Sequence, residues 1–284
     1  MSSQDGTRLV ITDLDGTLLD GETYDFRPAQ PGLDALRERR VSLVLCSSKT
    51  RAEMEPLARE LGLDAPLIVE NGGAIVLRAR MLPFLPPGGR QDGEYLVIPL
   101  GSTRDVLLAA LDPVAKEAGV TVRSFSVMTP GEVAKRTGLD PEAAARALKR
   151  EWDEPFVVEP EGDGATTLRL EEAARQRGLR VTHGGRFHHL TGTSDKGLAV
   201  RMLLKLLPDD PRGRTVGLGD AANDLPMLEA VDRPILMPRR DGTVDAALAA
   251  ALPGAEQAPE PGPAGWSAAI LGVLAGESLP RVPA

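Results

Sequence analysis

Two aspartates are the residues of this chain best suited to do chemistry. Asp13 and Asp15 end a short apolar run and are followed at once by a glycine. Two carboxylates in a tight turn can hold a hard cation beside a reacting group, and ligation by oxygen alone suits Mg²⁺ rather than zinc. A calcium-binding loop would need glycine at position 18 and glutamate at position 24. The chain has Leu18 and Tyr24 there, which disfavours that interpretation.

Polar residues also stand at the ends of three other apolar runs. They are Ser47-Ser48-Lys49, Glu70-Asn71-Gly72, and Asp220 with Asn223 and Asp224, while Lys196 opens a later predicted helix. Because open parallel sheets bind ligands at the carboxyl ends of their strands, these groups should converge on one crevice if the strands are neighbours. The carboxylates repel one another unless a cation lies among them. A hydroxyl, backbone N–H groups and a lysine ammonium are the groups that would hold a phosphoryl group.

Apolar runs alternating with helical spacing predict the elements that position these groups. Strands are expected over 9–11, 41–46 and 67–69, with helices over 31–39 and 54–61, the second one begun by a Thr50/Glu53 capping box. From residue 194 we expect a helix to 207, strands over 215–218 and 235–237, a helix through 227–228, and helices near 243–251 and 265–275. Near-continuous apolar strands alternating with helices are typical of a Rossmann-like, doubly wound parallel sheet in an α/β fold.

A different pattern separates the two halves of this core. A Pro/Gly-rich stretch near 83–93 predicts a linker into a smaller α+β unit. Short strands are expected there over 95–100, 120–125, 155–158, 166–170 and 180–182, with helices near 103–118, 130–137, 141–151 and 171–177. We therefore expect core segments over 1–83 and 190–284 and an inserted cap domain over 84–189.

The composition limits the possible partners and location. The chain has 284 residues and a net charge of −8, which argues against a nucleic-acid or anionic-membrane partner. Its single cysteine, Cys46, lies in an apolar strand pattern and is expected to be buried. We find no signal-peptide pattern and no run of transmembrane length. These features predict a cytoplasmic protein. We expect it to be a monomer or homodimer whose partner is a small molecule.

The motifs, in this order, resemble those of the haloacid dehalogenase superfamily of phosphatases. They are Asp-x-Asp-Gly-Thr from Asp13, the strand-end Ser47, Lys196, and Gly-Asp-x-x-Asn-Asp from Gly219. The long insertion is similar to that of the branch with a large α/β cap. More narrowly, the chain resembles the mannosyl-3-phosphoglycerate phosphatases, on Cys46–Thr50, Glu70–Gly73, Met128–Pro130, Glu154–Phe156, Gly184–Leu190 and Ser194–Gly197.

This resemblance implies a mechanism and a set of roles. Asp13 would be the nucleophile that forms an aspartyl-phosphate, and Asp15 the general acid and then the general base. The implied Mg²⁺ ligands are Asp13, the backbone carbonyl of Asp15, Asp220 and, through water, Asp224. The implied phosphate-binding residues are Ser47, Ser48, Lys196 and Asn223. The implied substrate is mannosyl-3-phosphoglycerate, with glucosyl-3-phosphoglycerate or a simple sugar phosphate as alternatives. A phosphomutase or a non-catalytic phosphosugar-binding module is disfavoured.

Other residues are candidates for contact with the substrate: Lys49, Asn71, Gly72, Thr129, Arg186 and His188. Thr129 and Glu132 form a capping box. It could serve only to begin a helix, or the N-terminus of that helix could bind the glycerate carboxylate. Alternation places Arg186 and His188 on one strand face, where Arg186 could clamp a carboxylate or phosphate. A structural role for His188 or His189 is equally open.

Overall fold

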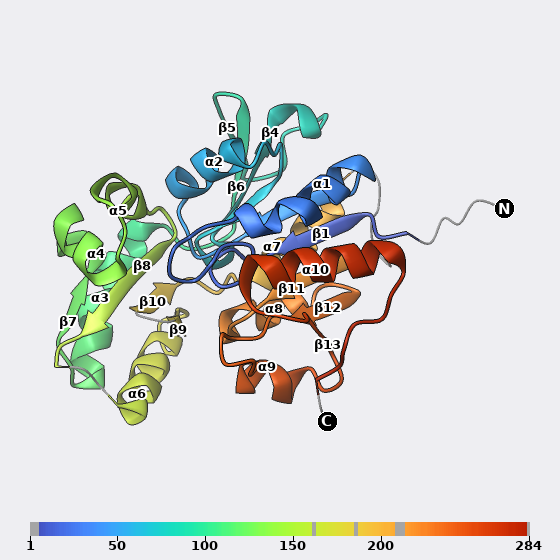
Figure 1. The fold of residues 1–284 in the computed structure, drawn as a ribbon. Coiled ribbons are helices and arrows are strands. Elements are labelled where there is room, and N and C mark those ends of the chain that lie inside the picture. The colour runs from blue at the N-terminus through green and yellow to red at the C-terminus, as the bar shows by residue number, and fades with distance from the viewer. Residues whose placement is uncertain (1–5, 161–162, 185–186, 208–213, 283–284) are drawn as a thin grey trace.

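The chain forms two units, each built on its own β-sheet (Figure 1). The computed structural model describes residues 6–160, 163–184, 187–207 and 214–282. The core unit contains β1 (Leu9–Thr12), α1 (Gln30–Glu38), β2 (Ser42–Cys46), α2 (Arg51–Glu60), β3 (Leu67–Val69), β4 (Ala74–Arg78), β5 (Arg90–Asp92), β6 (Tyr95–Pro99), α7 (Lys196–Leu206), β11 (Thr215–Gly219), α8 (Leu225–Leu228), β12 (Arg233–Leu236), α9 (Ala246–Ala251), β13 (Glu256–Gln257) and α10 (Gly262–Ala275). The cap unit contains α3 (Arg104–Ala118), β7 (Val122–Ser124), α4 (Pro130–Thr137), α5 (Pro141–Ala147), β8 (Asp153–Val158), α6 (Gly164–Arg175), β9 (Arg180–Gly184) and β10 (Phe187–Thr191).

The core sheet has the doubly wound architecture that the sequence predicts. Its order is β13-β12-β11-β1-β2-β3-β4-β6-β5, and β1 pairs in parallel with both β2 and β11. Successive residues of β1 are buried on opposite faces, Val10 against α1 and α10 and Ile11 against α7 and α8. Because helices cover both faces, the inner strands are apolar throughout, as expected for a buried parallel sheet.

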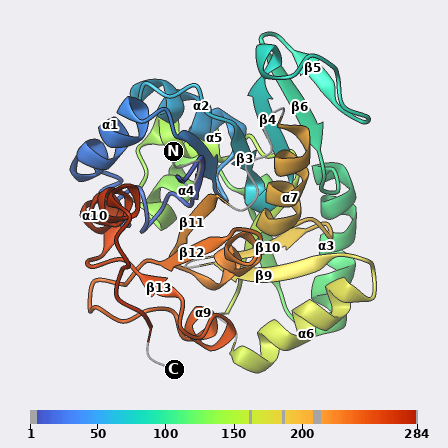
Figure 2. The same cartoon turned by 90° about the vertical axis from the view of Figure 1, so that its right-hand side faces the viewer.

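The predicted start of the cap is corrected by the strand pairing. The strand expected over 95–100 is β6, and it pairs antiparallel with β4 of the core sheet. Its neighbour β5 lies inside the stretch expected to be a linker. Leu96, Val97 and Ile98 are buried in the core clusters, so residues 84–99 extend the core rather than opening the cap. Figures 1 and 2 both show β4, β5 and β6 together at the end of the molecule opposite α6.

A second correction concerns residues 166–170, which were expected to form a strand. They lie inside α6, whose first turn is capped by Asp163 accepting from the backbone N–H of Thr166. Leu170, Ala173 and Ala174 are buried at helical spacing. The β-branched pair at 166–167 favours a strand locally, but packing of this face against α3 decides for a helix.

The cap sheet is antiparallel in the order β7-β8-β10-β9. Helices α3 and α6 cover one of its faces, and α4 and α5 pack with Phe125 and Phe187 on the other. The second face also meets the core, because the Thr50 hydroxyl at the start of α2 donates to the carbonyl of Arg146 at 3.0 Å. Among the described residues, no helix combines the length and apolar character needed to cross a membrane.

Candidate active site

Asp13 and Asp15 lie in the turn that follows β1, directly beside the end of β11. The pairing of Thr12 with Leu218 places Asp13 next to Asp220. Gly16 has φ of +82°, and a Cβ there would lie 2.7 Å from Oδ2 of Asp220. Glycine is therefore favoured by the backbone conformation, and a larger residue would also displace the Asp220 carboxylate.

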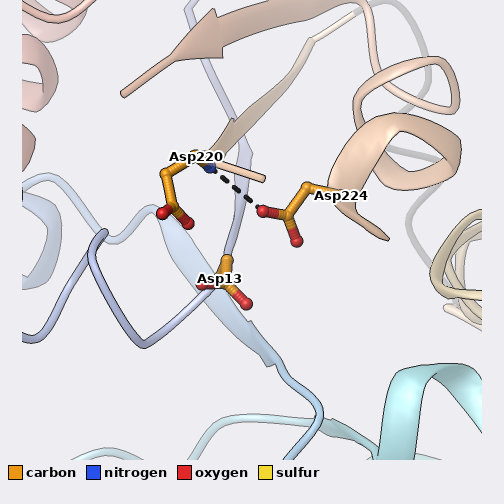
Figure 3. Close-up of side chains that lie close together, drawn as sticks. All are labelled: Asp13, Asp220 and Asp224. Atoms are coloured by element: carbon orange, nitrogen blue, oxygen red, sulfur yellow. Dashed lines mark hydrogen bonds between the residues drawn. The ribbon is translucent and has the colours of Figure 1, made fainter. Parts of the chain in front are cut away.

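Asp13, Asp220 and Asp224 form an acidic cluster in which Asp13 and Asp224 are buried and Asp220 is half-buried (Figure 3). One oxygen from each carboxylate lies within 4.8 Å of the others, and Oδ2 of Asp224 accepts from the backbone N–H of Asp220 at 3.0 Å. Burial and the charge of Asp224 raise the pKa of Asp13 well above its usual value. The same two causes raise the pKa of Asp220 to about 7. An all-oxygen cluster that is costly to ionise is suited to a hard divalent cation, so the cluster could hold a metal ion.

Asp15 is separate from this cluster at the side-chain level. Its Oδ2 pairs with Nζ of Lys49 at 2.9 Å, and that ammonium also lies 4.7 Å from the centre of the Tyr24 ring. Burial opposes the charged form of Lys49, but Asp15 and Glu53 outweigh it and raise the lysine pKa. The structure thus brings together the three aspartate side chains expected at the metal site and leaves the Asp15 carboxylate, which was not expected to be a ligand, beside them.

Lys196 is fully buried and bridges two of the three cluster aspartates. Its Nζ lies 2.6 Å from Oδ1 of Asp13 and 2.5 Å from Oδ1 of Asp224. Burial alone would lower the pKa of Lys196, but the two carboxylates raise it well above its usual value. The lysine stands at the first turn of α7, whose N-cap is Asp195. A permanent positive charge therefore sits against the acidic cluster.

The loop after β3 locates this lysine. Gly72 has φ of +90°, and a Cβ there would lie 2.2 Å from the backbone oxygen of Asp195. Gly72 is buried and lets the loop pack against the start of α7, which gives it a structural role in place of the predicted substrate contact. The buried Glu70 carboxylate accepts from the backbone N–H groups of Glu151 and Trp152, which joins the same loop to the cap. Burial raises the pKa of Glu70 to about 7.

The remaining core motif residues surround the acidic cluster. Ser47 is buried, and its Oγ accepts from the backbone N–H of Lys49 at 3.2 Å, whereas Ser48 lines the cleft. Asn223 donates to Oδ1 of Asn71 at 3.2 Å, and Asn71 donates in turn to Asp153 of the cap at 3.3 Å. All the predicted core residues thus gather at the carboxyl edge of the sheet.

A cleft of about 310 Å³ lies between this edge and the cap. Its described lining from the core includes Asp13, Asp15, Tyr24, Ser48, Lys49, Glu53, Asn71, Asp220 and Asn223. Its described lining from the cap includes Phe125, Thr137, Leu139, Arg150, Phe187 and His189. A larger cavity, about 770 Å³, lies at the opposite ends of the strands and contains none of the motif residues.

The cap residues differ from the prediction. Thr129 caps α4 as expected but is exposed and absent from the described cleft lining, which instead holds Thr137 from the other end of that helix. His188 stacks on Phe156 with ring centres 5.3 Å apart, and its neighbour His189 faces the cleft. The described cleft lining therefore includes His189 and not His188, the reverse of what was expected. Arg186 lies outside the described residues.

Sequence reasoning missed Arg150 and Asp153 and left the role of His189 open. These three residues form a cap cluster around the Asp153 carboxylate. Arg150 Nη1 and His189 Nδ1 both contact Oδ2 of Asp153, at 2.9 and 2.8 Å. Burial alone would raise the pKa of Asp153, but His189 and Arg150 outweigh it and lower that pKa. The available signal was the position of Arg150 and Asp153 immediately before the Glu154-Pro155-Phe156 segment.

Comparison with known proteins gives a consistent result. Residues 10–82 match the family model described as haloacid dehalogenase-like hydrolase. A glucosyl-3-phosphoglycerate/mannosyl-3-phosphoglycerate phosphatase of Methanococcoides burtonii is 38% identical over 267 residues, covering 94% of this chain and 97% of that protein. A mannosyl-3-phosphoglycerate phosphatase of Pyrococcus horikoshii is 34% identical and covers 81% of this chain and 90% of its own. The sucrose-phosphatase of Synechocystis has a similar fold, with a TM-score of 0.61 at 18% identity over 94% of this chain and 98% of that one.

Proposed function

The chain belongs to the haloacid dehalogenase-like hydrolase family and is a phosphatase, and from this premise we propose that its substrate is a sugar-3-phosphoglycerate. Mannosyl-3-phosphoglycerate is the substrate we propose first, with mannosylglycerate and phosphate as products. Mannosylglycerate is a compatible solute, so the proposed role is osmolyte synthesis in the cytoplasm. The observation that supports the proposal is the Asp13–Lys196 pair beside Asp220 in a cleft covered by the cap.

The proposed reaction has two displacements. An oxygen of Asp13 attacks phosphorus, and the bond from phosphorus to the ester oxygen breaks as that oxygen takes a proton from Asp15. Asp15 then removes a proton from water, which attacks phosphorus and breaks its bond to Asp13. Lys196 holds the nucleophile and offsets the charge that gathers on the phosphoryl oxygens. In this scheme, the Asp15–Lys49 pair opens when Asp15 carries the proton.

We propose Mg²⁺ as the cofactor, held by Asp13, the backbone carbonyl of Asp15 and Asp220, with Asp224 acting through water. The spacing of the three aspartates and the raised pKa values of Asp13 and Asp220 support this assignment. When bound, the ion would supply positive charge that offsets repulsion between the carboxylates and an incoming phosphate.

The proposed substrate class follows from the relatives and from the lining of the cleft. The two relatives described above are named for sugar-3-phosphoglycerates, one of them for both the glucosyl and the mannosyl compound. The cleft carries Lys49 and Arg150 besides its carboxylates, which suits an anionic molecule. Another capped sugar phosphatase is the second candidate, because the fold is also that of a sucrose-phosphatase.

Phosphate release tests the proposal. Purified protein is given mannosyl-3-phosphoglycerate, glucosyl-3-phosphoglycerate and a simple hexose phosphate, each with Mg²⁺ or with EDTA. We expect turnover of at least one phosphoglycerate, higher kcat/KM than for the hexose phosphate, no turnover in EDTA, and loss of turnover in Asp13→Asn. Preference for the hexose phosphate would favour the second candidate. Stoichiometric binding without phosphate release would favour a non-catalytic module.

A further inference from the structure

Arg150 is a buried cap arginine that lines the cleft and has a guanidinium nitrogen without a hydrogen-bond partner among the described residues. Its side chain is 6% exposed, and Nη1 donates to Asp153 at 2.9 Å and to the backbone carbonyl of Ser48 at 3.1 Å. Nε is buried and has no hydrogen-bond partner among the described residues. Buried polar groups without partners are rare in folded proteins, and Arg150 lines the cleft. Arg150 therefore has an unused hydrogen-bond donor at a residue that lines the cleft.

The orientation of Arg150 is held by its neighbours. The buried Asp153 carboxylate accepts from Arg150, pairs with His189 at 2.8 Å and accepts from Asn71 at 3.3 Å. Asn71 accepts in turn from Asn223, which lies between Asp220 and Asp224 in the chain. A chain of hydrogen bonds thus connects the Arg150 guanidinium to the loop that carries the acidic cluster, so that Arg150 has a defined position relative to the reacting phosphoryl group.

The distribution of charge assigns Arg150 a ligand. The described lining of the cleft on the core side carries Asp13, Asp15, Glu53 and Asp220. Lys49 and Arg150 are each paired with one carboxylate, but Arg150 also has Nε without a partner among the described residues. A sugar-3-phosphoglycerate brings a carboxylate as well as a phosphate, and that carboxylate would be repelled by the core acids. On the cap side, Arg150 carries a planar guanidinium. Nε and the neighbouring Nη on one edge of this group can donate two parallel hydrogen bonds to the two oxygens of a carboxylate.

We propose that Arg150 binds the substrate carboxylate and that Asp153 and His189 are positioning residues that hold its guanidinium in place. This inference rests on the proposed function, because it assigns the recognition of one part of the proposed substrate. It also replaces the N-terminus of α4 as the carboxylate site, since Thr129 is exposed and lies outside the described lining. Arg150 then distinguishes phosphoglycerate derivatives from other sugar phosphates.

The test compares one substrate in two forms. Wild-type protein, Arg150→Gln and Arg150→Lys are assayed with mannosyl-3-phosphoglycerate and with its methyl ester, whose carboxylate is neutralised. We expect wild type to have a KM about 30-fold or more lower for the acid, the low end of the cost of truncating a buried charge pair. Arg150→Gln should remove this preference by raising KM for the acid alone, with kcat nearly unchanged. Arg150→Lys should retain part of the preference for the acid, since lysine keeps the positive charge but cannot donate two parallel hydrogen bonds.

His189→Gln tests positioning, and it should raise KM for the acid less than Arg150→Gln does. Arg136→Gln is the control, because Arg136 pairs with Glu159 outside the described lining of the cleft. An equal rise in KM for the acid and for the ester in Arg150→Gln would overturn the inference. Arg150 would then contact the phosphoryl group or hold the cap against the core. If Arg150→Gln fails to fold, the same comparison in Arg150→Lys decides. If wild type hydrolyses no sugar-3-phosphoglycerate, the proposed function itself fails.

Discussion

Lys196 and Asp13 are 183 positions apart in the sequence, yet the Lys196 ammonium lies 2.6 Å from the Asp13 carboxylate. Both are buried, and Asp224 contacts the same ammonium at 2.5 Å. In a buried site an ion pair is weakly screened by solvent, so removing one partner leaves the other charge uncompensated. This relationship joins the first and last motifs of the chain at one buried site.

Replacing Lys196 by methionine is expected to lower kcat about 10²- to 10³-fold, the usual cost of removing one preorganised donor at a reacting group. Asp13 and Asp224 would also lose their shared cation, so Mg²⁺ should raise Tm more in this variant than in wild type. Steady-state kinetics and thermal unfolding check both effects. Lys205→Met, at an exposed position of the same helix, is the control. Near-normal kcat in Lys196→Met would contradict the assigned role.

Asp220→Asn is expected to raise the Mg²⁺ concentration for half-maximal activity about 10-fold or more, because one of the proposed ligands loses its charge. Activity measured against Mg²⁺ concentration gives this value, and the rise in Tm on adding Mg²⁺ gives an independent measure of binding. Asp241→Asn, in an exposed turn, should leave both unchanged. An unaltered Mg²⁺ requirement in Asp220→Asn would show that the ion is held elsewhere.

Gly72→Ala is expected to destabilise the fold by more than about 2 kcal/mol, through both the positive φ and the clash with Asp195. Gly93→Ala isolates the effect of the positive φ, since Gly93 has φ of +58° and no heavy atom within 4 Å of an added Cβ. That variant should cost about 1 kcal/mol. Chemical denaturation gives the free energy of unfolding of each variant. An equal decrease in the two variants would show that the loop moves away from Asp195 at no cost in stability.

Glu70 is expected to make stability depend on pH. Its pKa of about 7 in the folded protein lies above the usual 4.5, so between these values the folded state binds more protons than the unfolded state. The protonated form supports folding below about pH 4.5, and its contribution falls as pH rises through 7, by about 3 kcal/mol in all. The decrease in Tm from pH 5 to pH 8 should therefore be smaller in Glu70→Gln than in wild type.

The control for Glu70→Gln is Glu142→Gln, at an exposed position in the first turn of α5. Other buried carboxyls contribute to the same trend, because burial also raises the pKa values of Asp13 and Asp220. Only the difference between variant and wild type is attributed to Glu70. Identical pH dependence in wild type and Glu70→Gln would contradict this assignment.

The sequence alone predicted the strands that carry the motif residues and the assignment to the phosphatases. Local patterns predicted β1, β2, β3 and β11, since each is a short apolar run ending in polar residues, and the Thr50/Glu53 and Thr129/Glu132 capping boxes form as expected. Capping and burial of a continuous apolar run depend on residues within a few positions of one another, so they can be inferred from the sequence.

Features that depend on contacts between residues far apart in the sequence were decided only by the tertiary structure. Whether residues 95–99 join the core or the cap is set by pairing with β4, and whether 166–170 are helical is set by packing on α3. Alternation along β10 separates His188 from His189 but does not say which face meets the cleft. That choice, like the contacts of Arg150 with Asp153, depends on how the cap packs on the core, and no local pattern carries this information.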